Sequence, residues 1–342
     1  MKNVNNKNEA TKLLQQCKDA VANIVKLIGP IFDIVEDHFF QNENFDMIKG
    51  LIPLWLSDAG RCGESSMSKA YFEKVINCCN DELTNKLIYW FDLQSPIYAL
   101  QDRIESVNIL LSELYTHIPN YAIYEDNDYT SASRSMSVYS SIIHTCINSV
   151  FVHLASSFDL FTKIVYELEN IPNLVFSKRQ KLKSVRDGIL YSPNKIKNVN
   201  LKQDGMIFSN PPILRKVCSF RDYYIHNGSW DYRCAVYESF VDDTPADVFV
   251  LLPDTDENGN LETSGSRNMF YSKGEKINVT LPQIVIEVMS LYENTIKELF
   301  AQYPFVERER HIPDNFDVIC KNWNDCYMKI KCIPDQNKSS SK

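Results

Sequence analysis

The sequence is poor in the residues that interrupt packed structure, and it lacks a long apolar run. Only 10 of its 342 residues are glycine and 14 are proline, while 44% are hydrophobic and 23% are charged. This composition excludes collagen-like, low-complexity and intrinsically disordered chains. No stretch approaches the roughly 18 consecutive apolar residues of a membrane helix, and the N-terminus lacks the apolar core of a secretory signal. We therefore expect a soluble, cytoplasmic protein with no membrane partner.

Cysteine pairs with redox or metal-site spacing are also missing. The ten cysteines include no Cys-x-x-Cys pair, and without a secretory signal we expect reduced thiols rather than disulfides. The sequence contains no Walker loop, no dinucleotide-binding glycine fingerprint and no His-Glu-x-x-His pattern. It therefore predicts neither a metal site nor a cofactor.

Positive charge is concentrated in one part of the chain. The net charge is −8, from 36 basic and 44 acidic residues, but residues 178–221 hold eleven basic residues and two acidic ones, which is 11 − 2 = +9. Nucleic acid phosphates are bound by such local basic fields. We predict an RNA-binding surface in this segment, formed by Lys178, Arg179, Lys181, Lys183, Arg186, Arg215 and Lys216. A solvated helix face followed by a basic loop would give the same pattern.

Apolar residues recur at helical spacing over most of the chain, so the predicted fold class is mostly α. We expect an N-terminal helical bundle over residues 1–120, with helices at 8–28, 31–41, 46–58, 66–79, 81–92 and 96–117. The last has an apolar stripe from Ile97 to Leu114 with alternating steps of three and four, which we interpret as a bundle helix rather than an intermolecular coiled coil. The polar stretch 119–135 is the predicted linker.

A second helical domain is predicted over residues 130–303, with a small β-hairpin insertion at about 230–281. Its expected helices are 136–169, a short basic one at 177–190, 213–226 and 284–300. β-Branched and aromatic residues predict strands at 234–241, 247–252 and 276–281. Residues 304–342 are expected to be a C-terminal extension with a disordered end. Asp159 is an isolated charge in an apolar helix. It could point at the active site, but we expect a structural role beside a base such as Arg186 or Arg221.

The predicted helix 213–226 ends in a group of residues that can act on RNA, namely Arg221, Asp222, Tyr223, Tyr224 and His226. Histidine titrates near neutral pH, so it can remove the proton of a ribose 2′-hydroxyl or protonate the leaving 5′-oxygen. A guanidinium can bind the scissile phosphate through two hydrogen bonds. Asp222 lies four residues before His226, so it can orient the imidazole and favour its protonated form. Tyr223, Tyr224, Trp230 and Tyr232 are candidates for stacking on unpaired bases.

The spacing of Arg221 and His226 near the end of one helix, with a long helix before and a closing helix after, resembles the HEPN superfamily. This resemblance covers residues 130–303 and implies a compact helical domain, commonly a ribonuclease of phage defence, abortive infection or toxin–antitoxin systems. It also implies a homodimer whose active site forms where the two motif helices meet. Arg221 and His226 take the catalytic positions of the family, and Asp222 takes the polar position after the arginine, where asparagine is more frequent.

Together these observations predict a metal-independent endoribonuclease. Arg221 would bind the phosphate, His226 would transfer protons, and Asp222 would tune the histidine. The predicted partners are RNA, such as tRNA, a second copy of the chain, and a regulatory or antitoxin protein. The alternative is a non-catalytic helical module that binds RNA, a nucleotide or another protein.

Overall fold

The computed structural model describes residues 2–40, 58–63, 65–78, 81–118, 132–135, 137–241 and 244–306. The fold is mostly helical with a small antiparallel hairpin, which confirms the predicted fold class. The helices are α1 Lys2–Ile28, α2 Ile31–Phe40, α5 Lys69–Cys78, α6 Glu82–His117, α7 Val138–Asn170, α8 Lys183–Arg186, α9 Pro212–Asn227 and α10 Ile277–Gln302. The strands are β1 Ala132–Ser135, β2 Val236–Val241 and β3 Thr244–Phe249.

The chain divides into two compact units, each made of segments that are distant in the sequence. The larger unit comprises Met1–Gly29, Pro96–Glu169 and Ile189–Tyr303, and the smaller one comprises Pro30–Ser95, Asn170–Gly188 and Pro304–Lys342. This division differs from the sequence-based boundaries at 1–120, 130–303 and 304–342. The reason is that α1 and the second half of α6 pack within the same unit as α7 and α10.

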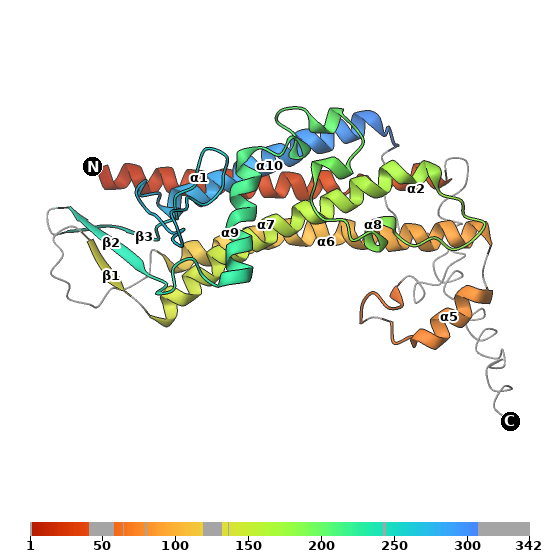
Figure 1. Cartoon of the computed structure of the whole chain (residues 1–342), viewed down its shortest axis with the longest axis horizontal. Coiled ribbons are helices and arrows are strands. Elements are labelled where there is room, and N and C mark those ends of the chain that lie inside the picture. Colours follow the sequence, from red (N-terminus) through yellow and green to blue (C-terminus); the bar gives the residue numbers. More distant parts are fainter. Residues whose placement is uncertain are drawn as a thin grey trace, which may run out of the picture. The chain divides into compact units, whose positions relative to one another are not determined.

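The larger unit is built around α1, α7, α10 and the part of α6 that follows Pro96. Helices α1 and α10 run side by side (Figure 1). Three hydrogen bonds connect further pairs, namely α6 with α1, α6 with α10, and α10 with α7: Gln101 Nε2 to the Val25 carbonyl at 3.1 Å, Tyr115 hydroxyl to the Asn278 carbonyl at 2.7 Å, and Tyr292 hydroxyl to Ser157 Oγ at 2.7 Å. The apolar stripe from Ile97 to Leu114 is fully buried, so α6 is a bundle helix, as expected.

Two sequence-based boundaries are wrong because packing overrides local signals. Helices 81–92 and 96–117 are one helix, α6, which continues through Pro96 because Leu93, Ile97 and Leu100 extend a single buried stripe across the proline. The predicted basic helix at 177–190 is helical only from Lys183 to Arg186. Most of the predicted helix 46–58 and the C-terminal end for which disorder is predicted lie outside the described residues.

The small sheet has the strand order β1-β2-β3, and both pairs are antiparallel. The hairpin β2–β3 confirms the predicted β insertion, whereas β1 comes from the end of the predicted linker 119–135, whose earlier part lies outside the described residues. The predicted strand 276–281 is wrong, because α10 begins at Ile277. Ile277 and Leu281 are buried on one face while Val279 is exposed, which fits helical rather than strand periodicity.

The smaller unit contains an aromatic cluster formed by Phe39, Tyr89 and Phe176, whose ring centroids lie 5.3 to 6.0 Å apart. Asn85 Nδ2 donates a hydrogen bond to the Phe176 carbonyl at 3.1 Å. These contacts hold the segment that carries five of the nine predicted RNA-binding residues.

One stretch, Val138–Asn173, is long and apolar enough to cross a membrane by length and composition. Core helices of soluble proteins share this property, and α7 buries Ile147, Val150 and Phe158 completely. The stretch is therefore weak evidence for a membrane segment.

Candidate functional site

Helix α9 carries all three predicted catalytic residues. It begins at Pro212, where the missing N–H of proline costs no helical hydrogen bond. It ends before Gly228, which has a φ of 86° and donates its N–H to the Tyr224 carbonyl at 3.1 Å. The ending predicted from Asn227-Gly228 is confirmed. The helix crosses α7 (Figure 1), and the rings of Phe220 and Phe151 lie 4.8 Å apart at the crossing.

The N-terminal half of α9 is held by the loop between β3 and α10. A Cβ atom on Gly259 would lie 2.1 Å from the Pro212 carbonyl oxygen and 2.7 Å from the Lys216 backbone nitrogen, so only glycine allows this approach. Lys216 Nζ also forms a 2.8 Å ion pair with Glu275 Oε2, and its side chain is only 13% exposed. Lys216, predicted to bind RNA, is therefore paired within the protein.

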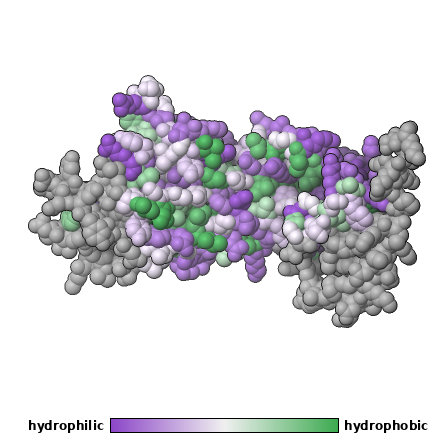
Figure 2. All heavy atoms as spheres, turned by 90° about the horizontal axis from the view of Figure 1, so that it is seen from below, coloured by the Kyte–Doolittle hydropathy of each residue, from purple (hydrophilic) through white to green (hydrophobic). Residues whose placement is uncertain are grey.

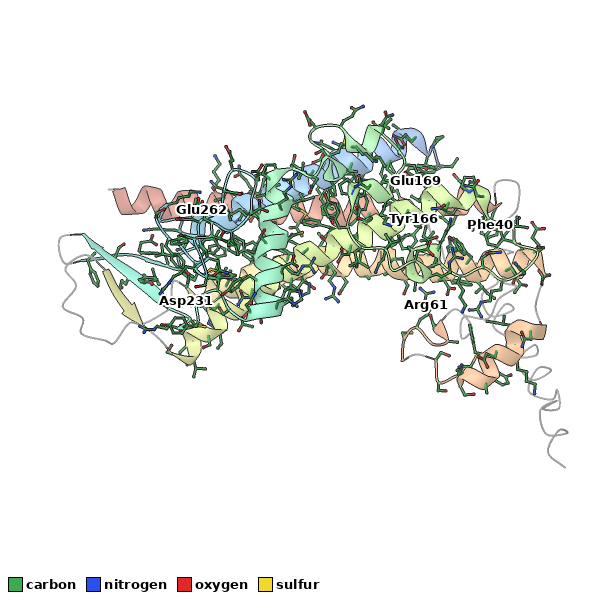
Figure 3. The ribbon with its side chains drawn as sticks, in the orientation of Figure 1. Phe40, Arg61, Tyr166, Glu169, Asp231 and Glu262 are labelled. Carbon is green, nitrogen blue, oxygen red and sulfur yellow. The ribbon has the colours of Figure 1, made fainter. Side chains whose placement is uncertain are left out.

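The loop that holds α9 is itself fixed by the buried carboxylate of Asp254. This carboxylate accepts hydrogen bonds from the Ser272 N–H and hydroxyl, both at 2.6 Å, and from the Lys273 N–H at 3.1 Å. Burial alone would raise the pKa of Asp254, but the hydrogen bonds from Ser272 and Lys273 outweigh it and lower that pKa. Lys273 Nζ binds the Thr255 carbonyl and Glu262, which is labelled in Figure 3.

Arg221 lies on the side of α9 that faces the protein, and 31% of its side chain is exposed. Its Nε lies 3.0 Å from Oδ1 of Asp222. Cys218, one turn earlier, is its other neighbour. Burial raises the pKa of the Cys218 thiol to about 11, while the positive charge of Arg221 opposes this shift and the negative charge of Asp222 adds to it. The three side chains therefore form one polar group on α9.

His226 is exposed in the last turn of α9. Asp222 was expected to contact it, but the structure pairs Asp222 with Arg221, and the described residues contain no hydrogen bond between Asp222 and His226. On a helix, Arg221 and His226 are separated by about 140° around the axis. One copy of α9 therefore presents its guanidinium and its imidazole in different directions.

The aromatic residues of the site are only partly accessible. Tyr223 and Tyr224 are half-buried, and Tyr232 is exposed. Trp230 is unavailable for base stacking, because it is 3% exposed and packs edge-on against Phe220, with ring centroids 5.3 Å apart. The sequence could not show this, since an aromatic residue in a loop is compatible with either role.

The segment after α9 is tied to α7 by a buried histidine. His144 is 1% exposed, and its Nε2 lies 3.1 Å from the Ala235 carbonyl oxygen; because a carbonyl only accepts, Nε2 carries the proton. Burial lowers the pKa of His144, opposed by this hydrogen bond and by the charge of Asp231. Asp231, beside the start of α7 in Figure 3, accepts the N–H groups of Arg233 and Ala235 at 2.9 Å each.

Two carboxylates of α7 fix the irregular connection that precedes α9. Asp159 Oδ1 accepts the backbone N–H of Tyr191 at 2.8 Å, so its role is structural and its partner is a backbone group rather than the expected Arg186 or Arg221. Glu169, labelled in Figure 3, accepts the N–H groups of Lys197 and Asn198 at 2.9 to 3.0 Å.

The predicted RNA-binding residues are divided between the two units. Arg215, Lys216, Tyr223 and Tyr224 belong to α9 in the larger unit, whereas the others belong to the smaller unit. Of these others, Lys178 and Lys181 are exposed. The remaining three have partners within the protein: Arg179 lies over the Phe72 ring at 5.3 Å, Lys183 Nζ donates to Asn170 Oδ1 at 3.2 Å, and Arg186 Nε lies 3.0 Å from Asp187 Oδ1.

Among the described residues, no group of three or more histidine, cysteine, aspartate or glutamate side chains is arranged to hold a metal ion. Comparison with protein-family models, with curated proteins and with solved structures finds no match to this chain.

Proposed function

We propose that this protein is a HEPN-type, metal-independent endoribonuclease whose active site is the C-terminal half of α9. The observation that carries the proposal is the presence of Arg221 and His226 near the end of one helix whose other end is fixed by the β insertion. Arg221 is partly exposed and His226 is exposed, so both can reach a bound nucleic acid. Rigid support beneath exposed functional groups is what catalysis needs.

The reaction follows from these two side chains. The ribose 2′-oxygen attacks the phosphorus and forms a new O2′–P bond, while the P–O5′ bond breaks. A base takes the 2′-hydroxyl proton, and an acid delivers a proton to the 5′-oxygen. Arg221 stabilises the negative charge that develops on the phosphate. The products are a 2′,3′-cyclic phosphate and a 5′-hydroxyl.

The geometry of α9 supports a homodimer through this helix. Base and acid are two roles, and each chain supplies one His226, so two copies of α9 would provide both. Exposed apolar residues on α7 and α9 offer a contact surface, namely Val138, Tyr139, Ile142 and Ile225. Figure 2 shows that hydrophobic side chains gather in patches on one face of the chain.

The partners that accompany this activity are RNA, such as tRNA, and a regulatory or antitoxin protein. Exposed Lys178, Lys181 and Arg215 support RNA binding, because they present positive charge to solvent. A cytoplasmic role in phage defence or toxin–antitoxin systems rests on the HEPN resemblance alone.

The test is incubation of the purified wild type, Arg221→Ala and His226→Ala with total RNA in excess EDTA. We expect that only the wild type produces fragments ending in cyclic phosphates. Equal cleavage and equal cellular toxicity by all three proteins would contradict the proposal.

A second candidate is a module that binds RNA or a nucleotide without cleaving it. The observation in its favour is the Arg221–Asp222 ion pair, which occupies the group that catalysis would use. RNA binding that depends on salt, produces no fragments and is unaffected by His226→Ala would favour this function.

A further inference from the structure

The partner of Arg221 in the structure is a carboxylate that carries the same charge as a phosphate. Arg221 Nε and Asp222 Oδ1 lie 3.0 Å apart. A guanidinium can bind a phosphate through two parallel hydrogen bonds, and it uses Nε or its terminal nitrogens to do so. Nε is buried and forms no hydrogen bond among the described residues, so its contact with Asp222 is an ion pair, and 31% of the side chain reaches solvent. A phosphate that binds the exposed part of Arg221 therefore approaches a carboxylate that is already paired with the same guanidinium.

We infer that Asp222 is a positioning residue that competes with the substrate phosphate for Arg221, so that phosphate binding must displace the Asp222 carboxylate. The identity of the phosphate as part of RNA rests on the proposed function. The competition itself does not, because inorganic phosphate can probe it.

The position of Asp222 on α9 makes the displacement feasible. Its side chain is 55% exposed, so the carboxylate can leave Arg221 for water at low cost. It also lies four residues before His226, on the same side of the helix. The displaced carboxylate therefore remains within reach of the imidazole.

The expected size of the competition follows from the weakness of exposed ion pairs. A binding group that is partly occupied in the unbound protein lowers the apparent affinity in proportion to that occupancy. For an exposed pair, the effect on the phosphate dissociation constant is roughly two- to fivefold. The ion pair would thus tune binding rather than abolish it.

The first measurement follows the ¹⁵Nε–¹H NMR signal of Arg221, assigned by its loss in Arg221→Gln, during titration with inorganic phosphate. We expect Asp222→Asn to move this signal in the unliganded protein and to lower the phosphate dissociation constant roughly two- to fivefold. Asp222→Glu keeps the charge and should bind phosphate about as weakly as the wild type. Circular dichroism would check that the exposed substitutions leave α9 folded.

Two controls separate competition from a general change in charge. Asp204→Asn neutralises an exposed carboxylate in the same basic stretch, and we expect it to change phosphate affinity less than about 1.5-fold. In the Arg221→Gln background, Asp222→Asn should have no further effect on binding, measured by isothermal titration calorimetry. The inference is overturned if Asp222→Asn acts no more strongly than Asp204→Asn, or acts equally without Arg221.

A parallel titration with a 2′-deoxy-substituted oligoribonucleotide distinguishes this inference from the proposed function. If Asp222→Asn tightens phosphate binding but neither the wild type nor this variant binds the oligonucleotide, the inference stands and the ribonuclease proposal fails. If that oligonucleotide is bound and unmodified RNA is cleaved in the assay with total RNA, while Asp222→Asn has no effect on phosphate binding, the proposed function stands and the inference is wrong.

Discussion

The two halves of α9 differ in how closely the rest of the protein packs against them. The first half is in contact with the loop after β3, where Gly259 lies against the helix backbone and Glu275 pairs with Lys216. The second half keeps its inner face packed through Phe220, but Asp222 and His226 are exposed. The comparison indicates that one end of the helix provides stability, while the other end presents reactive groups.

This difference has a physical basis. Backbone-to-backbone contact, as at Gly259, leaves no space for water or a ligand and tolerates little movement. An exposed charged or polar side chain keeps its hydration in the folded protein, so its position at the surface costs little free energy. A substrate can then replace the water bound to it. The predictions that follow separate the two halves by stability and by activity.

The largest effect is expected at the exposed half. His226→Ala should lower RNA cleavage by roughly 10²- to 10⁴-fold, because it removes a group that transfers protons. The free energy of unfolding should change by less than about 0.5 kcal/mol, since an exposed surface residue contributes little to stability. Cleavage assays and urea unfolding would measure the two quantities, and a loss of activity that only follows a loss of stability would contradict the assignment.

The next effect is expected at the packed half. Gly259→Ala should lower the free energy of unfolding by at least about 3 kcal/mol, because its Cβ would collide with the backbone of α9. Gly265→Ala is the matched control, since Gly265 also has a positive φ, 58°, but a methyl group added there would have no neighbouring atom within 4 Å. It should cost only about 1 to 2 kcal/mol. Equal costs in urea unfolding would show that the contact with α9 is unimportant.

Two adjacent basic residues on α9 should differ in RNA binding. Arg215→Gln removes an exposed charge. It should lower by about one the number of phosphate contacts inferred from the salt dependence of RNA binding. Lys216→Gln removes a charge that is already paired with Glu275, so it should change the salt slope less and lower stability by about 1 kcal/mol. Binding titrations at several salt concentrations would test this, and identical slopes for both variants would contradict it.

The smallest expected effect is on the pH dependence of stability. It concerns His144, which binds the segment that follows α9. Because burial lowers the folded-state pKa of His144 below its ordinary value of 6.5, the unfolded state binds the proton more readily. The stability that neutral His144 gives the folded state is fully present above about pH 6.5. It is lost as the pH falls toward the lowered folded-state pKa. His144→Gln should flatten this part of the stability profile, as measured by thermal unfolding between pH 5 and 8. An unchanged profile would show that His144 is not its source.

Local patterns predicted several elements of this protein correctly. The stripe from Ile97 to Leu114 identified a buried bundle helix, Asn227-Gly228 marked the end of α9, and β-branched residues identified the β2–β3 hairpin. Each of these signals lies inside the element it predicts or directly beside it. The same holds for the grouping of Arg221, Asp222 and His226 on one helix, which spacing alone fixes.

The tertiary structure decided what those residues contact. Spacing allowed Asp222 to reach either His226 or Arg221, and the fold pairs it with Arg221. The contact of Gly259 with Pro212 and the burial of Trp230 involve residues whose local sequence permits an exposed loop equally well. Helical and strand periodicity report which face of an element is apolar, but the partner of that face depends on segments far away in the chain. For this reason the sequence determined the elements and the grouping of the candidate residues, whereas only packing decided which of them are held and which remain accessible.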